Sequence, residues 1–440
     1  MGDFARFQTD LPGTSVAMSS GMVRKVAWVS MFLVACVGDD SVTPGQDSGG
    51  TDSGAIETGA DASGSDASVN DVAVDAPPPP CGAAGESCCK APIAPCGDGL
   101  TCSTDATPKC MVSDVYALGI YQTVTPGPNL ITTYPVAHYD GVAWTLMPPA
   151  KSVSSGFTPY DPIELLDVGT APYVLSNEND IGFEYRWNGV SWQQCKLGNS
   201  CVGPTMNTYV WGMTAVSNSG ATDIWLAGTN TMFRCANGAS SCVSVTNGIN
   251  GTWGEGTFGG TTSQDIWYSQ YDHVLHYDGT QWSSMAVADA FSIAVLAPND
   301  AWVGAKQFRH WDGKTWSSAY LASGQQLPAN ITHMQGSGSN DVHAVGRDNT
   351  NASFAAHWDG TAWKSTTLPS GMLNARRVYA PSPIEAFTVG GKGSNKGVIA
   401  KWNGTSWSEM PSPTVTYSGE TQAGSLTWVA VSGQARPRTN

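Results

Sequence analysis

Two phrases that recur along the last three-quarters of the chain predict an all-β fold made of repeated four-stranded units. The first phrase has an Asp-Gly or Asn-Gly core between aromatic residues, as in His310-Trp-Asp-Gly-Lys-Thr-Trp316. The second phrase, Asp-x-aromatic-x-x-Gly, comes before it, as in Asp223-Ile-Trp-Leu-Ala-Gly228. A period of about 35–50 residues is typical of architectures in which no single unit buries a core alone.

The first phrase predicts a β-hairpin, because Asn, Asp and Gly tolerate the positive φ angles of a two-residue type I′ turn. With Asp312 and Gly313 as the turn, Trp311 would face Lys314 and Trp316 would lie diagonally across on the same face. Each hairpin would then close with an aromatic clasp, and in one disguised copy a Cys235–Cys242 disulfide would replace the rings. The copies are His138–Trp144, Arg186–Trp192, Arg234–Cys242, His276–Trp282, His310–Trp316, His357–Trp363 and Lys401–Trp407.

The second phrase and a leading apolar segment complete each unit, which gives four short strands, the composition of a β-propeller blade. The second phrase begins at Asp114, Asp223, Asp265, Asp300 and Asp341. A near copy begins at Glu385 and a degenerate copy at Pro172. The leading segments are 163–168, 211–217, 253–259, 291–296, 331–336 and 375–380.

The two ends of the repeat region predict how the ring closes. The first unit lacks a leading segment, and Ser425-Leu-Thr-Trp-Val-Ala-Val431 resembles the missing strand. We therefore predict a seven-bladed β-propeller over 113–433, closed by its C-terminal strand so that no sheet edge is left open. An open sheet or a different number of blades is the alternative, and 434–440 would be a tail.

Composition narrows the possible partners. The 440 residues carry a net charge of −15, and only 13% of them are charged, with the basic residues scattered along the chain. This balance argues against a nucleic-acid partner. We expect a monomer, with an unidentified surface protein or glycan as its ligand.

The N-terminal segments predict export and lipid attachment. Residues 1–21 are polar and fit no known role, so Met22 looks like the true start. Residues 22–36 have a basic start and an apolar stretch too short to cross a bilayer, which indicates a signal peptide. This signal ends in Leu33-Val-Ala-Cys36, which resembles the bacterial lipobox and implies lipid attachment at Cys36; an ordinary secretory signal is the alternative. Residues 37–80 hold nine acidic residues and no basic ones, which is typical of a disordered tether.

Eleven cysteines leave an even number once Cys36 is set aside for lipid, as an oxidising compartment predicts. Six of them fall within 81–112, a segment too small to hold a core without disulfides. We expect three disulfides there, with the connectivity open, rather than a zinc site, since the spacing fits paired ligation poorly. These six are Cys81, Cys88, Cys89, Cys96, Cys102 and Cys110. Nearest-neighbour pairing predicts Cys195–Cys201 and Cys235–Cys242 for the others, with a cross-blade pairing as the alternative.

The two repeated phrases, over about 114–431, resemble those of secreted propeller lipoproteins of Gram-negative bacteria. The 81–112 module loosely resembles small secreted modules of the Dickkopf and colipase-like kind. The family resemblance implies a role at the cell surface. We expect attachment to the cell envelope, with the outer membrane as the default because Val37 follows the lipidated cysteine.

The residues that could bind a metal or act in catalysis are of two kinds, those that recur from blade to blade and those that occur once. The repeated His138, His276, His310 and His357 occupy the same place in different blades, so they cannot converge on a metal, and we expect no metal site or cofactor. We expect the repeated Asp to accept backbone N–H bonds before a strand, with peripheral calcium as the alternative role. The channel wall offers weak catalytic candidates for a hydrolase or lyase acting on a polysaccharide. These are Glu255, His333, Arg376 and Arg377.

The loops that join the second to the third strand, and one blade to the next, vary in length and share one face of the predicted ring. Variable loops on a rigid scaffold are where binding usually occurs. We expect exposed ligand-binding tyrosines there, at Tyr121, Tyr160, Tyr209, Tyr320 and Tyr417. The leading hypothesis is a membrane-anchored scaffold for binding or adhesion that is not an enzyme. A polysaccharide-active enzyme and a passive envelope component are the alternatives.

Overall fold

The computed structural model describes part of the chain, and every regular element in that part is a β-strand or shorter than one helical turn. It covers residues 100–436 apart from 103–109, 125–129, 151, 155–161, 168–170, 179–180, 197–209, 219–220, 229–230, 237–241, 247–248, 250–255, 305, 323–328, 349, 351, 394–395 and 417–423. The predicted signal peptide, Cys36, the tether and most of the cysteine module lie outside these residues. Among the described residues no helix is long and apolar enough to cross a membrane.

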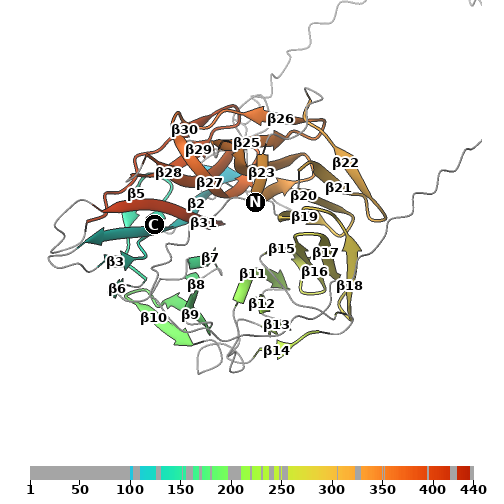
Figure 1. Ribbon diagram of the computed structural model, residues 1–440, viewed down its shortest axis with the longest axis horizontal. Helices are drawn as coiled ribbons and strands as arrows, with labels where there is room; N and C mark the ends of the chain where they lie inside the picture. Colours follow the sequence, from blue (N-terminus) through green and yellow to red (C-terminus); the bar gives the residue numbers. More distant parts are fainter. Residues whose placement is uncertain are drawn as a thin grey trace, which may run out of the picture. The chain divides into compact units, whose positions relative to one another are not determined.

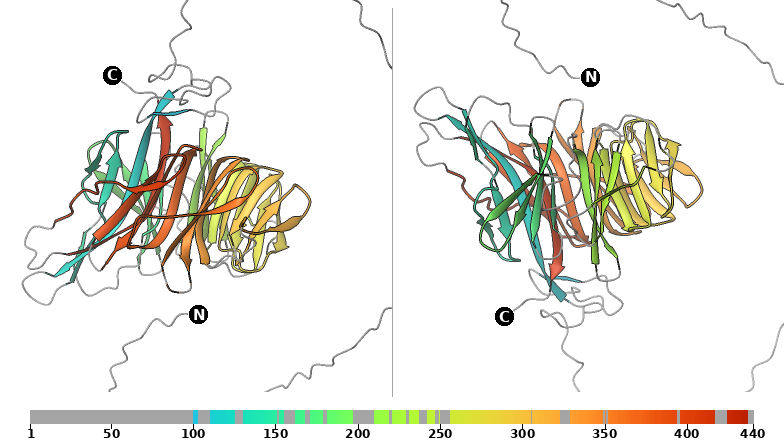
Figure 2. Two further views of the ribbon diagram at one scale, coloured as in Figure 1. Left: turned by 90° about the horizontal axis from the view of Figure 1, so that it is seen from above. Right: turned by 90° about the horizontal axis from the view of Figure 1, so that it is seen from below.

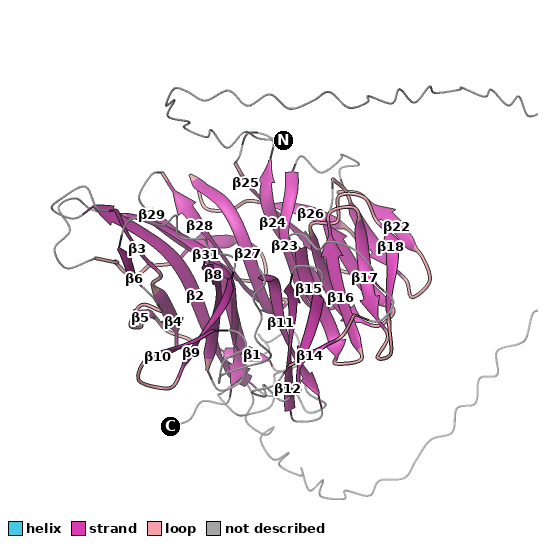
Figure 3. Cartoon of the chain, turned by 60° about the horizontal axis from the view of Figure 1, so that its bottom comes forward, coloured by secondary structure: helices cyan, strands magenta, loops and turns pink. Residues whose placement is uncertain are grey.

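Seven antiparallel sheets are arranged around a common axis, as the colours of Figure 1 show from blue to red. The chain is therefore an all-β, seven-bladed β-propeller, and the prediction of fold class is confirmed. Seen from the side, the strands of each blade run through the thickness of the ring (Figure 2). Figure 3 shows the same arrangement by element type, with strands throughout.

Six of the blades have four strands each. Blade two consists of β7 (Pro162–Asp167), β8 (Pro172–Glu178), β9 (Ile181–Trp187) and β10 (Trp192–Lys196). Blade three consists of β11 (Val210–Asn218), β12 (Ala221–Gly228), β13 (Thr231–Cys235) and β14 (Val243–Ser244). Blade four consists of β15 (Gly256–Thr262), β16 (Asp265–Gln270), β17 (His273–Tyr277) and β18 (Trp282–Ala286).

The remaining four-stranded blades follow the same order, with the first strand innermost. Blade five consists of β19 (Ser292–Ala297), β20 (Asp300–Gly304), β21 (Phe308–Trp311) and β22 (Trp316–Ala319). Blade six consists of β23 (Ala329–Gly338), β24 (Asp341–Asp348), β25 (Ser353–Trp358) and β26 (Trp363–Thr366). Blade seven consists of β27 (Met372–Ser382), β28 (Glu385–Lys392), β29 (Lys396–Trp402) and β30 (Trp407–Glu409).

Blade one joins the two ends of the repeat region. Its strands are β1 (Leu100–Cys102), β2 (Cys110–Val124), β3 (Leu130–Thr133), β4 (Val136–Tyr139), β5 (Trp144–Leu146), β6 (Ser152–Ser154) and β31 (Ser425–Arg436). β31 pairs antiparallel with β2 from Gln122↔Ser425 to Val112↔Arg436, so the C-terminal strand completes the first blade as predicted. Trp428 of β31 is fully buried in the core between blades one and seven. β1 also pairs with β2, which places Cys102 opposite Cys110 in the register.

The repeated hairpin differs from the predicted two-residue turn. Trp311 pairs directly with Trp316 across the ladder, and the Asp312 N–H donates to the Thr315 carbonyl at 3.3 Å, so the two central residues are Gly313 and Lys314 and not Asp312 and Gly313. The Asp312 carboxylate accepts the backbone N–H groups of Lys314 and Thr315, and only Gly313 has positive φ. The side-chain oxygen thus replaces part of the backbone hydrogen bonding of a tight turn. The same bonds occur at Asp140, Asn188, Asp278, Asp359 and Asn403.

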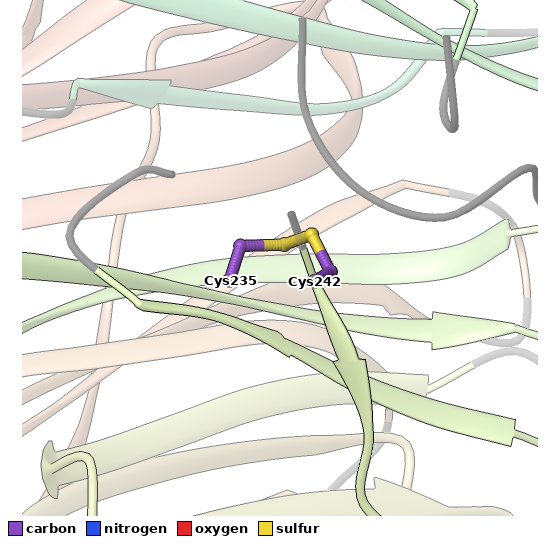
Figure 4. The surroundings of a disulfide bond; sticks show 2 residues. All are labelled: Cys235 and Cys242. Atoms are coloured by element: carbon purple, nitrogen blue, oxygen red, sulfur yellow. A yellow bond between two sulfur atoms is a disulfide. The ribbon is translucent and has the colours of Figure 1, made fainter. Parts of the chain in front are cut away.

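The register makes the aromatic clasp a directly opposed pair in each of the six plain copies. The ring centroids of Trp311 and Trp316 lie 5.5 Å apart. In the seventh copy Cys235 and Cys242 form a buried disulfide at the corresponding positions, as predicted (Figure 4). Cys195 and Cys201, the other predicted pair, lie outside the residues whose side chains the structure describes.

Adjacent blades are joined by one recurring aromatic contact. The aromatic residue of the second phrase in one blade meets the clasp of the next blade edge to face. Trp267 of blade four meets Trp316 of blade five at 6.1 Å and 85°. Equivalent contacts are Trp225–Trp282, Trp302–Trp363, His343–Trp407 and Phe387–Trp144. Edge-to-face geometry is the favourable arrangement for such rings, so the two phrases together form the packing between blades.

Candidate functional site

The channel wall holds an ion pair between two blades that are not neighbours. Arg377 on β27 of blade seven donates to Glu164 on β7 of blade two, with 2.9 Å between Nη2 and Oε2. Both side chains are largely buried. Burial raises the pKa of the Glu164 carboxyl above its ordinary value, and the Arg377 charge opposes that rise. The two opposite charges therefore neutralise each other within the channel wall.

His333 lies next to this pair on β23, the inner strand of blade six. Its Nδ1 accepts the backbone N–H of Val378 at 3.3 Å. Burial and, after it, the Arg377 charge hold the pKa of the His333 imidazole well below its ordinary value. His333 is therefore a neutral acceptor that ties blade six to blade seven.

The predicted channel candidates divide into three groups. The structure brings His333 and Arg377 together. Arg376 is exposed on β27, the strand that carries Arg377. Glu255 lies outside the described residues. The carboxylate that joins the cluster is Glu164, which sequence reasoning missed. Its signal was a single acidic residue inside the apolar segment Ile163-Glu-Leu-Leu166 on a predicted inner strand.

The repeated His residues pair with the repeated Asp residues of their own blades. His310 Nε2 lies 2.8 Å from Asp300 Oδ1, and the His310 ring lies over Trp302. Other blades repeat the pair as His138–Asp114, Arg234–Asp223, His276–Asp265, His357–Asp341 and Lys401–Glu385. These Asp side chains therefore accept from basic side chains, whereas backbone N–H donors were predicted. The reason is that the repeated Asp lies on a strand diagonal to the basic residue of the next strand.

Blade six departs from this pattern because a histidine stands at the aromatic position of the second phrase. His343 is fully buried, stacks on His357 at 4.4 Å, and has Nε2 3.4 Å from Asp341 Oδ1. One ligand atom from each of Asp341, His343 and His357 lies within 4.8 Å of the others. These are the residues that could hold a metal ion among those described.

The tyrosines predicted to be exposed differ in their exposure in the structure. Tyr320 is exposed at the end of β22, as predicted, with 51% of its surface accessible. Tyr121 is buried, with only 3% exposed, so its prediction as an exposed ligand-binding residue is wrong. β2 extends to Val124, and Tyr121 lies there between Thr133 and Leu426 while its hydroxyl accepts the N–H of Gly424. Tyr160, Tyr209 and Tyr417 lie outside the described residues.

A second exposed tyrosine on the same face was not predicted. Tyr271, 60% exposed, lies in the turn between β16 and β17 and packs edge to face on Phe291 at 5.4 Å. The backbone carbonyl of Tyr271 accepts the N–H of Ala290, which fixes the turn to the segment that leads into blade five. Beside that segment, Lys306 lies 3.1 Å from Asp289. We call Tyr271, Asp289, Phe291 and Lys306 the Tyr271 patch.

Comparisons with known proteins identify no family for this chain. No family model and no curated protein matches the chain. Solved structures that are similar include a GH74 xyloglucanase from Xanthomonas campestris, 14% identical over 58% of this chain and 46% of the other, with a TM-score of 0.44. A puromycin-hydrolyzing peptidase from Mycobacterium tuberculosis is 8% identical over 72% and 54%, also with a TM-score of 0.44. A fucose-specific lectin from Aleuria aurantia is 12% identical over 58% and 96%, with a TM-score of 0.38.

Proposed function

We propose that this chain is an exported, lipid-anchored β-propeller that acts as a scaffold for binding a glycan or a surface protein. The Tyr271 patch is the observation that carries the proposal. An exposed ring held against a second ring offers a flat apolar surface at low entropic cost. The neighbouring carboxylate and ammonium groups can form hydrogen bonds that fix a ligand's orientation.

The location of the patch supports a binding role. It lies at the turn between β16 and β17 and at the β18–β19 and β20–β21 connections. These connections share one face of the ring, the face with the variable loops, and Tyr320 follows on the next connection. The opposite face carries the stereotyped hairpin loops. A rigid scaffold with variable loops on one face is a common arrangement for recognition.

The first experiment measures thermal unfolding of the chain with a panel of glycans and with calcium. A ligand that binds only the folded state raises the unfolding midpoint by mass action. We expect a rise with one glycan class that is lost in Tyr271→Ala. Val190→Ser, at an exposed position on the opposite face, is the matched control and should keep the rise. If no glycan shifts the midpoint, capture of a surface protein by wild type and not by Tyr271→Ala supports the protein ligand; failure of both contradicts the proposal.

The alternative enzymatic function is tested in the same samples. Degradation of a glycan would favour a hydrolase or lyase in the channel mouth, and loss of that activity in His333→Gln would assign it there. Membrane attachment is tested separately by fatty-acid labelling in a bacterial host. We expect label on the wild-type chain and none on Cys36→Ala.

A further inference from the structure

We propose that Asp341, His343 and His357 form a binding site for a divalent transition-metal ion such as Zn²⁺ between blades six and seven. All three come from β24 and β25, adjacent strands of one sheet, so the fold itself brings them together. Two imidazoles and one carboxylate are a ligand set that suits zinc and similar ions.

The strongest argument is the state of His343. Its side chain is fully buried, and among the described residues neither ring nitrogen has a hydrogen-bond partner. Buried polar atoms are nearly always paired, so an imidazole with two unpaired nitrogens requires an explanation. Its Nε2 lies 3.4 Å from the Asp341 oxygen that is also 2.7 Å from His357 Nε2. A metal ion bound by all three atoms would give His343 its missing partner.

The residues that stand at the position of His343 in other blades serve as a comparison. Blade four has Trp267 at the position of His343, and its indole N–H donates to Asp265 Oδ1 at 2.8 Å. Blades three and five also have tryptophan there, at Trp225 and Trp302, and the indole N–H of each is buried without a hydrogen-bond partner among the described residues. In each of them the ring packs edge to face on the next clasp, as His343 does on Trp407. A tryptophan at this position therefore makes the same packing contact. What His343 adds is two ring nitrogens that can bind a metal ion.

The surroundings suit a bound cation. Ser337 donates to Asp341 Oδ2 at 2.6 Å, which orients the carboxylate and leaves Oδ1 toward the two histidines. Such outer partners fix metal ligands in place. His357 is slightly exposed, so a metal ion can reach the site from solvent, and a water molecule can be its fourth ligand.

The test measures metal content of the purified full chain after equilibration with micromolar Zn²⁺ and gel filtration. We expect one Zn²⁺ per wild-type chain, and visible absorption bands when Co²⁺ replaces it. His343→Trp restores the residue of blades three to five, so it should fold and hold less than a tenth of the metal. His357→Gln is the second variant, with the same expected loss of metal and of the Co²⁺ bands.

The matched control is His310→Gln, which removes the corresponding histidine where the neighbour is Trp302. It should keep the full metal content. A wild-type chain that holds no Zn²⁺ or Co²⁺ would overturn the proposal. It would also be overturned if His343→Trp retained as much metal as wild type, because the ions would then be bound elsewhere. Neither result depends on whether the Tyr271 patch binds a glycan.

Discussion

The guanidinium of Arg377 lies 2.9 Å from the carboxylate of Glu164, although the two residues are 213 positions apart in the chain. They belong to blades seven and two, and β31 of blade one contacts both of their strands. The ion pair therefore joins the two blades on either side of the closing blade. Its position links the stability of the channel wall to closure of the ring.

Removal of either partner should destabilise the fold. In Arg377→Met the largely buried Glu164 carboxylate loses its counter-ion, and a charged hydrogen bond of this kind contributes about 1.5–3 kcal/mol. We expect a lower free energy of unfolding in urea for Arg377→Met and for Glu164→Gln. The double variant should lose less than the sum of the two, because each single change leaves the other group without this ion-pair contact. Strictly additive losses would show that the contact contributes nothing to stability.

Acid should weaken the fold through His333. The folded-state pKa of His333 lies well below that of the unfolded chain, because of burial and Arg377. The stability that a neutral His333 provides is therefore complete above about pH 6.5 and declines as pH falls below it, at up to about 1.4 kcal/mol per pH unit. His333→Gln should flatten that decline in unfolding measured between pH 7 and pH 5. Val190→Ser, an exposed change that removes no titratable group, is the control and should keep the wild-type slope.

Much of the architecture could be predicted from local sequence. Asp-Gly pairs and regularly spaced tryptophans are signals that act over a few residues, so they predicted the blades and the Cys235–Cys242 disulfide. The missing strand at Ser425 could be placed because the first unit was one segment short. The turn type was wrong because the Asp312 side chain competes with the backbone for the same N–H groups, which residue propensities alone do not reveal.

The sites were harder to predict because they depend on contacts between distant segments. Glu164 is one acidic residue in an apolar segment, and its importance comes from Arg377 in another blade. Tyr121 was predicted to be exposed because the length of β2 could not be read from the sequence. His343 was assigned to an aromatic position by the repeat pattern, and its unpaired nitrogens become visible only once the fold places Asp341 and His357 around it.

The Asp278 loop should show a measurable acid titration. Hydrogen bonds from the Thr280 hydroxyl and from the backbone N–H groups of Gln281 and Thr280 lower the pKa of Asp278 to about 2. The stability contributed by the ionised carboxylate is present above about pH 4 and is lost as pH falls toward 2. NMR titration of the Asp278 carboxyl should give that pKa. Asp278→Asn should keep the loop, since Asn188 and Asn403 form the same bonds in other blades, and a collapse of blade four in that variant would contradict this account.

Closure by the C-terminal strand should determine whether the ring folds at all. A chain that ends at Gly424 loses β31, which leaves β2 without its partner and removes Trp428 from the core between blades one and seven. We expect this variant to lose the cooperative thermal transition, because an open edge and the exposed faces of two blades replace a closed ring. Deletion of 437–440 alone is the control and should leave the transition unchanged. A cooperative transition at the wild-type midpoint in the chain without β31 would show that six complete blades are sufficient.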